Sequence, residues 1–234
     1  METQNVLLSS LTEAQIEKLS PLEPVTLRRH DVIYRMDDEV THLYFLERGF
    51  VSLIRPLPDS NRISAWNFDG TMVGSQFRFL RPATLYDICM RVDGHGWRVP
   101  RERLLGAMLT DSNFASKIVG WMYYFDHAVA KSAACQMSHT VEQRLCRLLQ
   151  AAALAVRGGP IDLNLSQIAD MLPAARAHVD RLAEQLEAIG AIRLTKRRIE
   201  IIDRTLVAAR SCVCFEAINQ RRRAALQLHG NLMK

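Results

Sequence analysis

At 234 residues, 48% hydrophobic and 24% charged, the chain has the composition of a folded globular protein, which excludes a chain that is disordered throughout. No apolar run reaches the ~18–20 residues that a bilayer span needs. The first residues show no basic region followed by an apolar stretch, as a secretion signal would. We therefore expect a cytoplasmic protein that does not bind membranes.

The net charge of +5 is distributed unevenly along the chain. Residues 1–137 hold 15 Lys and Arg against 16 Asp and Glu, whereas residues 138–234 hold 15 against 9. The C-terminal part therefore carries a net charge of +6. This asymmetry favours a polyanion-binding domain joined to a neutral one over a chance segregation of surface charge.

Residues 26–99 consist of short apolar runs separated by turn-forming residues. The runs HLYFLERG, FVSLIR and RISAWNF are rich in β-branched and aromatic residues, and RG, PLPDSN and FDGT separate them. The DGHGW stretch around His95 is typical of a tight β-turn. The close and even spacing predicts consecutive antiparallel strands that form a roll or barrel.

Residues 111–136 have the pattern of one long helix. An apolar stripe with alternating spacings of four and three residues continues for about three heptads, as in a coiled coil. We predict that this stripe packs partly on the β-domain and forms a dimer interface along the rest, although an ordinary core-facing helix would show the same pattern. The stripe consists of Phe114, Ile118, Trp121, Phe125, Ala128, Ser132 and Cys135.

A second helix over residues 139–156 ends at RGGP, and two helices separated by a short turn follow it. Ser166 is placed to cap the first of them, Pro173 ends it, and the second runs to Ile189 with Gly190 after it. On a helical wheel the second helix has an apolar arc, predicted as Ala175, Val179, Leu182, Leu186 and Ile189. This arrangement is a helix-turn-helix, whose second helix fits the major groove of DNA.

The exposed face of that second helix is basic in its N-terminal half, with Ala177 at its centre and Arg176, His178 and Arg181 around it. The following AIRLTKRRIEIID alternates with period two on both sides of TKRR, which predicts a β-hairpin. Lys196, Arg197 and Arg198 lie at or near its tip, as in a basic wing that contacts phosphates. The last helix, around residues 209–230, receives no predicted role beyond packing.

The five cysteines are odd in number and scattered, which argues against a disulfide framework. Cys212 and Cys214 are two residues apart, and on a helix such side chains point in different directions. We therefore predict free thiols, no metal site and no cofactor. The five are Cys89, Cys135, Cys146, Cys212 and Cys214.

With a β-roll, a long heptad helix and a winged helix-turn-helix in this order, the chain resembles the Crp/Fnr family of bacterial transcription regulators over roughly residues 10–220. The resemblance is carried by HLYFLERGFVSLIRPLPDSNRISAWNFDGTMVG, VPRERL, TVEQRLCRLL, LSQIADML, ARAHVDRLAEQLEAIGAIRL and RRIEIID. It implies an α+β fold in three parts. These are a cyclic-nucleotide-binding-like β-roll sensor domain (1–110), a dimerisation helix (111–137) and a winged helix-turn-helix DNA-binding domain (138–234).

The resemblance also implies a homodimer that binds a two-fold-symmetric promoter site on double-stranded DNA and contacts RNA polymerase. In the family the second helix usually begins Ser-Arg-Glu-Thr-Val-x-Arg, and here the same register reads Ala175 to Arg181. Both arginines carry over, but Ala177 replaces the glutamate and cannot accept a hydrogen bond from cytosine. The half-site is therefore expected to depart from the family's best-known TGTGA. Ser166, Gln167, His178, Lys196, Arg197 and Arg198 are the other expected DNA contacts, and Pro173 stands where the family mostly has glycine.

The positions that hold cyclic AMP in some family members are changed here. Gly74 is followed by Ser75 instead of glutamate, Arg81 comes six positions later, and Pro82 lacks an N–H donor. Ser75, Arg81 and Thr84 are the residues of the possible effector pocket. We favour a regulator that binds DNA without cyclic AMP or an iron–sulfur cluster and is controlled by its abundance or by cysteine oxidation.

Two alternative functions stay open. One is a sensor-regulator gated by a cyclic nucleotide or by haem, for which His30, His42, His95 or His127 would be the ligand. The other is a signal-binding dimer whose DNA-binding domain no longer reads sequence, because the family's glutamate is lost and Asp180 faces outward. An enzyme is not expected, because the chain has no phosphate-binding glycine loop and no hydrolase or metalloprotease motif.

Overall fold

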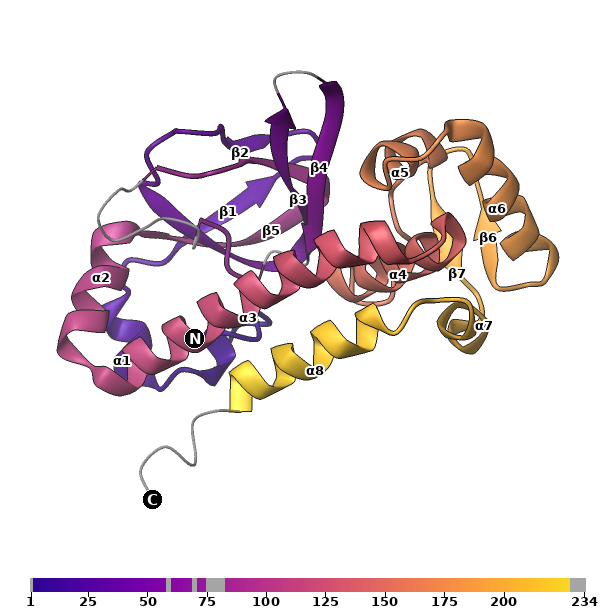
Figure 1. The fold of residues 1–234 in the computed structure, drawn as a ribbon. Helices are drawn as coiled ribbons and strands as arrows, with labels where there is room; N and C mark the ends of the chain where they lie inside the picture. Colours follow the sequence, from indigo (N-terminus) through magenta and orange to yellow (C-terminus); the bar gives the residue numbers. More distant parts are fainter. Residues whose placement is uncertain (1, 58–59, 69–70, 75–82, 228–234) are drawn as a thin grey trace.

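The computed structural model describes residues 2–57, 60–68, 71–74 and 83–227. Figure 1 shows a β-roll on one side and a smaller helical domain on the other, connected by one long helix that runs across the front of the molecule. The roll begins with a 3-10 turn η1 (Leu8–Ser10) and a short helix α1 (Glu13–Lys18). Its strands are β1 (Glu23–Leu27), β2 (Val32–Tyr34), β3 (His42–Leu57), β4 (Ser60–Phe68) and β5 (Asp87–Pro100).

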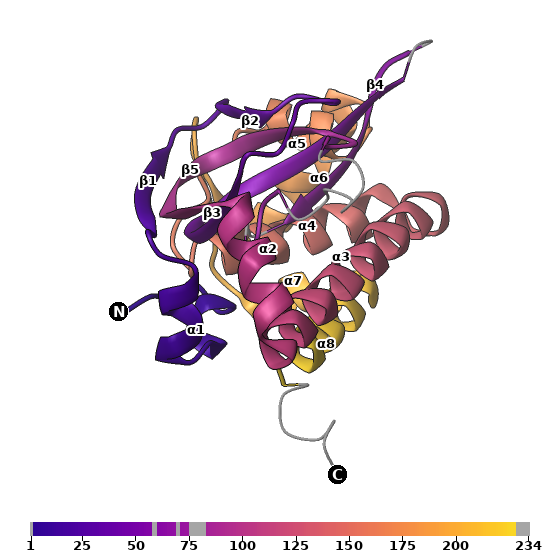
Figure 2. The same cartoon turned by 90° about the vertical axis from the view of Figure 1, so that its left-hand side faces the viewer.

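The five strands form one antiparallel sheet in the order β1-β5-β3-β4, with β2 also paired to β5. The two long strands β3 and β5 pair along most of their length, and the sheet curls around its apolar side chains (Figures 1 and 2). Phe45, Leu53, Ile88 and Met90 are among the fully buried residues. The predicted antiparallel roll is therefore confirmed.

Two local predictions within the roll are wrong. The RG dipeptide does not end a strand, since β3 continues through Arg48 and Gly49 with shifts in register between Leu46 and Val51. Gly49 adopts a φ of 145°, which glycine tolerates and which lets the strand bulge without ending.

The DGHGW stretch is likewise not a turn, because it lies inside β5 and pairs with both β1 and β3. A side chain at Gly96 would collide with the backbone carbonyl oxygen of Phe45, so this glycine serves the close approach of two strands. Glycines inside a strand and glycines in a turn look alike in sequence.

Two helices follow the roll, α2 (Arg101–Thr110) and the long α3 (Ser112–Ser138). The Asp111 side chain caps α3 by accepting a hydrogen bond from the Phe114 N–H at 2.9 Å. The last helix, α8 (Cys214–Gln227), returns beside α3 in the opposite direction, as both views show (Figures 1 and 2). It thereby packs against the helix that was predicted to dimerise.

The seven residues predicted to form the dimer interface do not lie on the surface of α3. All are buried within the single chain, because the roll and α8 cover this face. The apolar periodicity was therefore a core-facing stripe along its full length. The residues are Phe114, Ile118, Trp121, Phe125, Ala128, Ser132 and Cys135.

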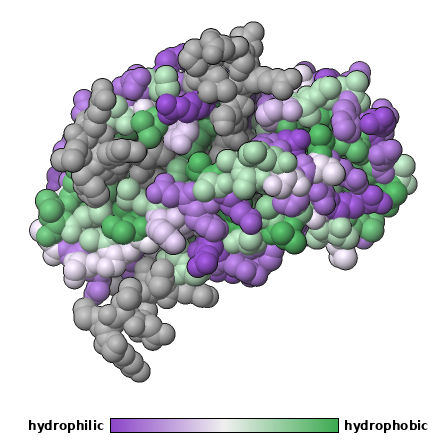
Figure 3. Space-filling view, viewed as in Figure 1, coloured by the Kyte–Doolittle hydropathy of each residue, from purple (hydrophilic) through white to green (hydrophobic). Residues whose placement is uncertain are grey.

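A second stripe with the same heptad spacing lies on the opposite, exposed face of α3. Val119 is 52% exposed, Tyr123 68% and Met137 90%. Figure 3, in the orientation of Figure 1, shows apolar and polar residues intermixed over this side of the molecule. We call this set the outer stripe: Ser116, Val119, Tyr123, Asp126, Ala130, Ala133 and Met137.

The helical domain contains α4 (Val141–Ala155), α5 (Leu165–Met171), α6 (Arg176–Ala188), the strands β6 (Ile192–Leu194) and β7 (Ile199–Ile201), and α7 (Arg204–Ala209). Thr140 caps α4 in a reciprocal arrangement with Gln143, and the helix gives way to a turn at Arg157–Gly159. The apolar core of the helical domain also contains Phe50 and Val92 of the roll. The two domains therefore share buried side chains.

Among the described residues, no helix combines the length and the apolar composition needed to cross a membrane.

Candidate nucleic-acid interface

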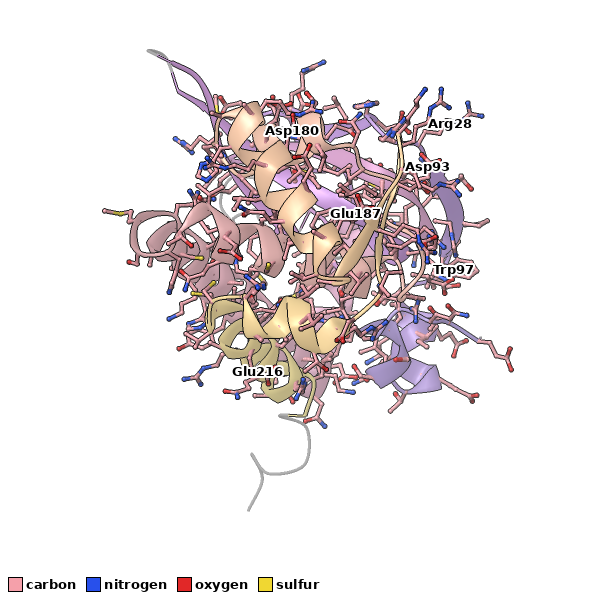
Figure 4. The ribbon with its side chains drawn as sticks, turned by 90° about the vertical axis from the view of Figure 1, so that its right-hand side faces the viewer. Arg28, Asp93, Trp97, Asp180, Glu187 and Glu216 are labelled. Carbon is pink, nitrogen blue, oxygen red and sulfur yellow. The ribbon has the colours of Figure 1, made fainter. Side chains whose placement is uncertain are left out.

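Helix α6 lies at the surface of the helical domain. Figure 4, which looks at the right-hand side of Figure 1, shows α6 in the foreground with Asp180 in its first half and Glu187 toward its end. Val179, Leu182, Ala183 and Leu186 anchor its inner face. Of the predicted apolar arc, Ala175 is exposed and Ile189 is 40% exposed, because both lie at the ends of the helix, beyond the core.

The outward face of α6 carries the predicted basic residues. Arg176, Ala177 and Arg181 are exposed and His178 is half-buried. The Nε of Arg176 lies 2.6 Å from a carboxylate oxygen of Asp180, one helical turn later. Asp180 therefore does not face a DNA phosphate as an unpaired negative charge. Within the described part of the chain, Arg181 has no ion-pair partner and is available for a polyanion.

The N-terminus of α6 is open. Its capping residue is Ala175, which offers no side-chain acceptor to the first N–H groups of the helix. Such N–H groups at a helix start are suited to a phosphate oxygen. The helix therefore presents both backbone donors and arginines on the same end.

The predicted β-hairpin is present as β6 and β7, which pair from Ile192 with Ile201 to Leu194 with Ile199. A turn closed by the Thr195 N–H donating to the Arg198 carbonyl places Lys196 and Arg197 at the exposed tip. Arg198 differs from them, because its Nε lies 2.5 Å from a carboxylate oxygen of Asp162. This ion pair connects the wing to the segment before α5.

The structure changes the assignment of the α5 residues. Asn164, not Ser166, caps α5, since its side chain accepts from the Gln167 N–H at 3.0 Å. The Gln167 side-chain oxygen in turn accepts from the Asn164 N–H, so that end of Gln167 is occupied. Ser166 is exposed beside it. Asparagine and serine are almost equally good caps, so the residue types alone do not choose between two positions so close together.

The turn between α5 and α6 contains Pro173 with a φ of 26°. The proline ring favours a φ near −65°, so the backbone is strained here. A glycine would adopt this conformation freely.

Of the possible effector residues, Ser75 and Arg81 lie outside the described residues. Thr84 is fully buried, and its hydroxyl donates to the Tyr86 carbonyl and accepts from the Tyr86 N–H. Its backbone bonds to Asp37 and Asp38. The Thr84 hydroxyl is thus engaged within its own loop.

The cysteines gather in a way that the sequence analysis did not anticipate. Cys212 lies in the connection between α7 and α8 and Cys214 begins α8, so the helical spacing rule does not apply to this pair. Both lie close to Cys135 and His139 at the end of α3. Burial raises the pKa of Cys135 to about 12, opposed by the nearby Arg147 guanidinium, and burial also raises the pKa of Cys214.

Two family models match the chain. The cyclic nucleotide-binding domain matches residues 24–111, and the Crp-like helix-turn-helix domain matches residues 143–210. These ranges cover the roll strands β2–β5 completely and include α5, α6 and the β6–β7 hairpin. No curated protein matches the sequence.

Solved structures of similar fold are numerous. The structure of FixK2 from Bradyrhizobium japonicum has a TM-score of 0.63 at 21% identity, and the match covers 82% of this chain and 98% of that one. A crp/fnr-family transcriptional regulator from Eubacterium rectale has a TM-score of 0.62 at 19% identity, covering 87% and 96%. The c-di-GMP responsive regulator CLP from Xanthomonas campestris has a TM-score of 0.61 at 17% identity, covering 82% and 100%.

The roll, the exposed α6 and the wing therefore occur in the order and the positions that both family models and these folds share. The chain belongs to the Crp/Fnr family of transcription regulators.

Proposed function

We propose that the chain acts in the cytoplasm as a homodimer that binds a two-fold-symmetric promoter site and contacts RNA polymerase. In this proposal α6 enters the major groove and the wing contacts the phosphate backbone. The two α6 helices of a dimer would meet successive major grooves about 34 Å apart. The proposed activity contains no catalytic step.

The observation that carries the proposal is the exposed start of α6. Arg176, Ala177 and Arg181 face outward, the helix N-terminus has no side-chain cap, and Lys196 and Arg197 project from the wing that follows. The net charge of +6 after residue 137 supplies the long-range attraction that DNA binding needs. Arg181 is the stronger candidate for a base contact, since Arg176 is already paired with Asp180.

For the dimer we propose the outer stripe of α3 in place of the residues predicted from sequence. Its heptad spacing matches a coiled-coil seam, and Val119, Tyr123 and Met137 are apolar or aromatic side chains left exposed by the single chain. Pairing α3 with its copy in a second chain would bury them. The small Ala130 and Ala133 would let the two helices approach closely.

We further propose that DNA binding does not require cyclic AMP. Thr84 uses its hydroxyl within its own loop, and the sequence has no glutamate after Gly74 and a proline at position 82. A cyclic phosphate needs backbone and hydroxyl donors that are free.

Selection from random DNA duplexes, run with and without cyclic AMP, tests the proposal. We expect an enriched palindrome with half-sites about one helical turn apart, the same with and without the nucleotide. A parallel selection with Ala177→Glu should move the half-site toward TGTGA, because glutamate can accept a hydrogen bond from cytosine.

Two other outcomes would contradict parts of this proposal. Enrichment only with cyclic AMP would restore the nucleotide-gated alternative. Weak binding that is indifferent to sequence would show a DNA-binding domain that no longer reads bases.

A further inference from the structure

Four potential metal ligands converge where the long helix meets the end of the helical domain. Cys135 lies in the last turn of α3, His139 follows that helix, and Cys212 and Cys214 come from the connection into α8. Their ligating atoms all lie within 4.8 Å of one another. Three segments that are far apart in sequence therefore present three sulfurs and one imidazole nitrogen to one point.

The spacing of these atoms fits a single tetrahedral ion. Zinc binds thiolate sulfur at about 2.3 Å and imidazole nitrogen at about 2.0–2.1 Å, which places neighbouring ligand atoms about 3.5–3.8 Å apart. The Sγ atoms of Cys135 and Cys212 are 3.5 Å apart, and the Cys214 Sγ is 3.7 Å from the His139 Nδ1. Three sulfurs and one nitrogen form the closed ligand set of a structural zinc site, and such soft ligands do not suit magnesium or calcium.

The surrounding charges provide an independent argument. Arg144 and Arg147 of α4 are buried near these cysteines, and among the described residues neither forms an ion pair with a carboxylate. Arg147 donates to the Ser132 hydroxyl and Arg144 to the Leu172 carbonyl, while the Nε atom of each lacks an acceptor in the described part of the chain. A buried guanidinium without a counter-charge is strongly unfavourable. Zinc with three thiolates and a neutral imidazole carries a net charge of −1, which would offset one of the two positive charges.

We propose that Cys135, His139, Cys212 and Cys214 bind one Zn²⁺ per chain and that this ion fastens the start of α8 to the end of α3. Binding forms three Zn–S bonds and one Zn–N bond and releases three thiol protons to solvent. The site closes a loop of chain between Cys135 and Cys212, which lie 77 positions apart. It holds together the helix that carries the outer stripe and the domain that carries α6.

Metal content is the first measurement. Full-length protein purified under reducing conditions with zinc present should contain one zinc per chain by elemental mass spectrometry. After the zinc is stripped, added Co²⁺ should give the visible bands of a tetrahedral ion and the near-ultraviolet sulfur-to-cobalt charge-transfer band. A chain free of zinc and without the cobalt bands would overturn the proposal, as would an intact mass two units low from a Cys135–Cys212 disulfide in the protein as purified.

Variants then assign the ligands. Cys212→Ser and Cys214→Ser should each lose the bound zinc, and the charge-transfer band of any cobalt that still binds should weaken. The matched control is Cys146→Ser, because Cys146 is equally buried but packs in the core of the helical domain and is not one of the four converging ligands. That control should keep one zinc per chain. Zinc retained by all the cluster variants would contradict the assignment.

A measurement on the unmodified chain guards against variants that do not fold. Stripping the zinc should lower the midpoint of thermal unfolding, and adding zinc back should restore it, because a ligand bound only by the folded state stabilises that state. An unchanged midpoint with no zinc uptake would overturn the proposal. These results do not depend on DNA, so the zinc site and the proposed DNA binding can fail separately.

Discussion

The two domains differ in how their functional positions are arranged. In the roll, the described effector position Thr84 is buried and its hydroxyl is bonded within its own loop. In the helical domain, Arg181, Lys196 and Arg197 stand exposed around an uncapped helix start. Among the described residues, the predicted effector side chain is therefore engaged within the roll, whereas the predicted DNA-contact side chains of α6 and the wing tip stay exposed. This difference teaches that a cyclic nucleotide-binding fold does not by itself establish that a nucleotide is bound.

The largest effect is expected from breaking the proposed dimer. Tyr123→Glu places a charge in the centre of the outer stripe, so two α3 helices would repel each other. We expect a monomer by light scattering and an affinity for a palindromic duplex reduced about 100-fold to 10,000-fold, since the avidity of paired half-sites is lost. Leu109→Glu is the matched control, because Leu109 is 88% exposed on α2 and lies off the stripe. If the Tyr123→Glu variant were still a dimer, the interface would lie outside the outer stripe.

The next effect separates recognition of bases from contact with the phosphate backbone. Arg181→Ala should reduce discrimination at one base pair of the half-site by about 1–3 kcal/mol. Arg197→Ala should weaken all duplexes about equally and reduce the slope of log affinity against log salt by about 0.9 per half-site contact. Arg193→Ala is the control, because Arg193 is already paired with Glu200 on the neighbouring strand. Equal losses for Arg181→Ala and Arg197→Ala in both measurements would contradict the two roles.

A smaller effect concerns the turn before α6. Pro173→Gly removes a ring held at a φ of 26° and replaces it with the residue that tolerates this conformation. We expect relief of this strain to raise the free energy of unfolding by about 1–3 kcal/mol. The greater conformational freedom of glycine in the unfolded chain reduces this gain. Chemical denaturation measures the change in the free energy of unfolding. A clear loss of stability would show that the turn is not strained.

The smallest effect lies in the roll and depends on pH. Burial alone would raise the pKa of Glu47, but hydrogen bonds from the Thr3 hydroxyl, the Gln4 N–H and the Trp97 ring N–H outweigh it and lower the pKa. A lowered pKa means that the ionised carboxylate stabilises the fold above its unfolded pKa. That contribution is lost as the pH falls through the folded pKa.

Thermal unfolding of the wild type and of Glu47→Gln, measured at several pH values, tests this contribution of the Glu47 carboxylate. The stability advantage of the wild type should shrink on acidification from about pH 6 to below the ordinary glutamate pKa of about 4.3. If the stability difference between the wild type and Glu47→Gln were the same at every pH, the charge of Glu47 would not stabilise the fold.

The sequence predicted the order of the elements and the exposed basic residues of α6 and the wing, because local signals determine them. The proline after Leu172, the period of α6 and the alternation on both sides of TKRR act over a few residues each. At the start of α5, Asn164 replaced Ser166 as the cap, a change of two positions between similar side chains.

The errors came from contacts between distant segments. Helix α3 carries two stripes of heptad spacing, and periodicity alone does not reveal that α8 covers one of them. The cysteine cluster was missed for a related reason, since Cys212 and Cys214 are arranged by a break between two helices and meet a residue 77 positions away. Arg144 and Arg147 are the two charged residues among the otherwise apolar buried residues of α4, and they were a signal that pointed to this region.

Phe50 and Val92 extend from the roll into the core of the helical domain, and this restricts how the two domains move. Swinging α6 away from its present position would expose both side chains to water at a cost of roughly 1.5–3 kcal/mol each. A molecule that alternated between DNA-competent and DNA-incompetent arrangements would have to repay that cost with new contacts in its other state. The shared core therefore opposes any movement of the helical domain away from the roll.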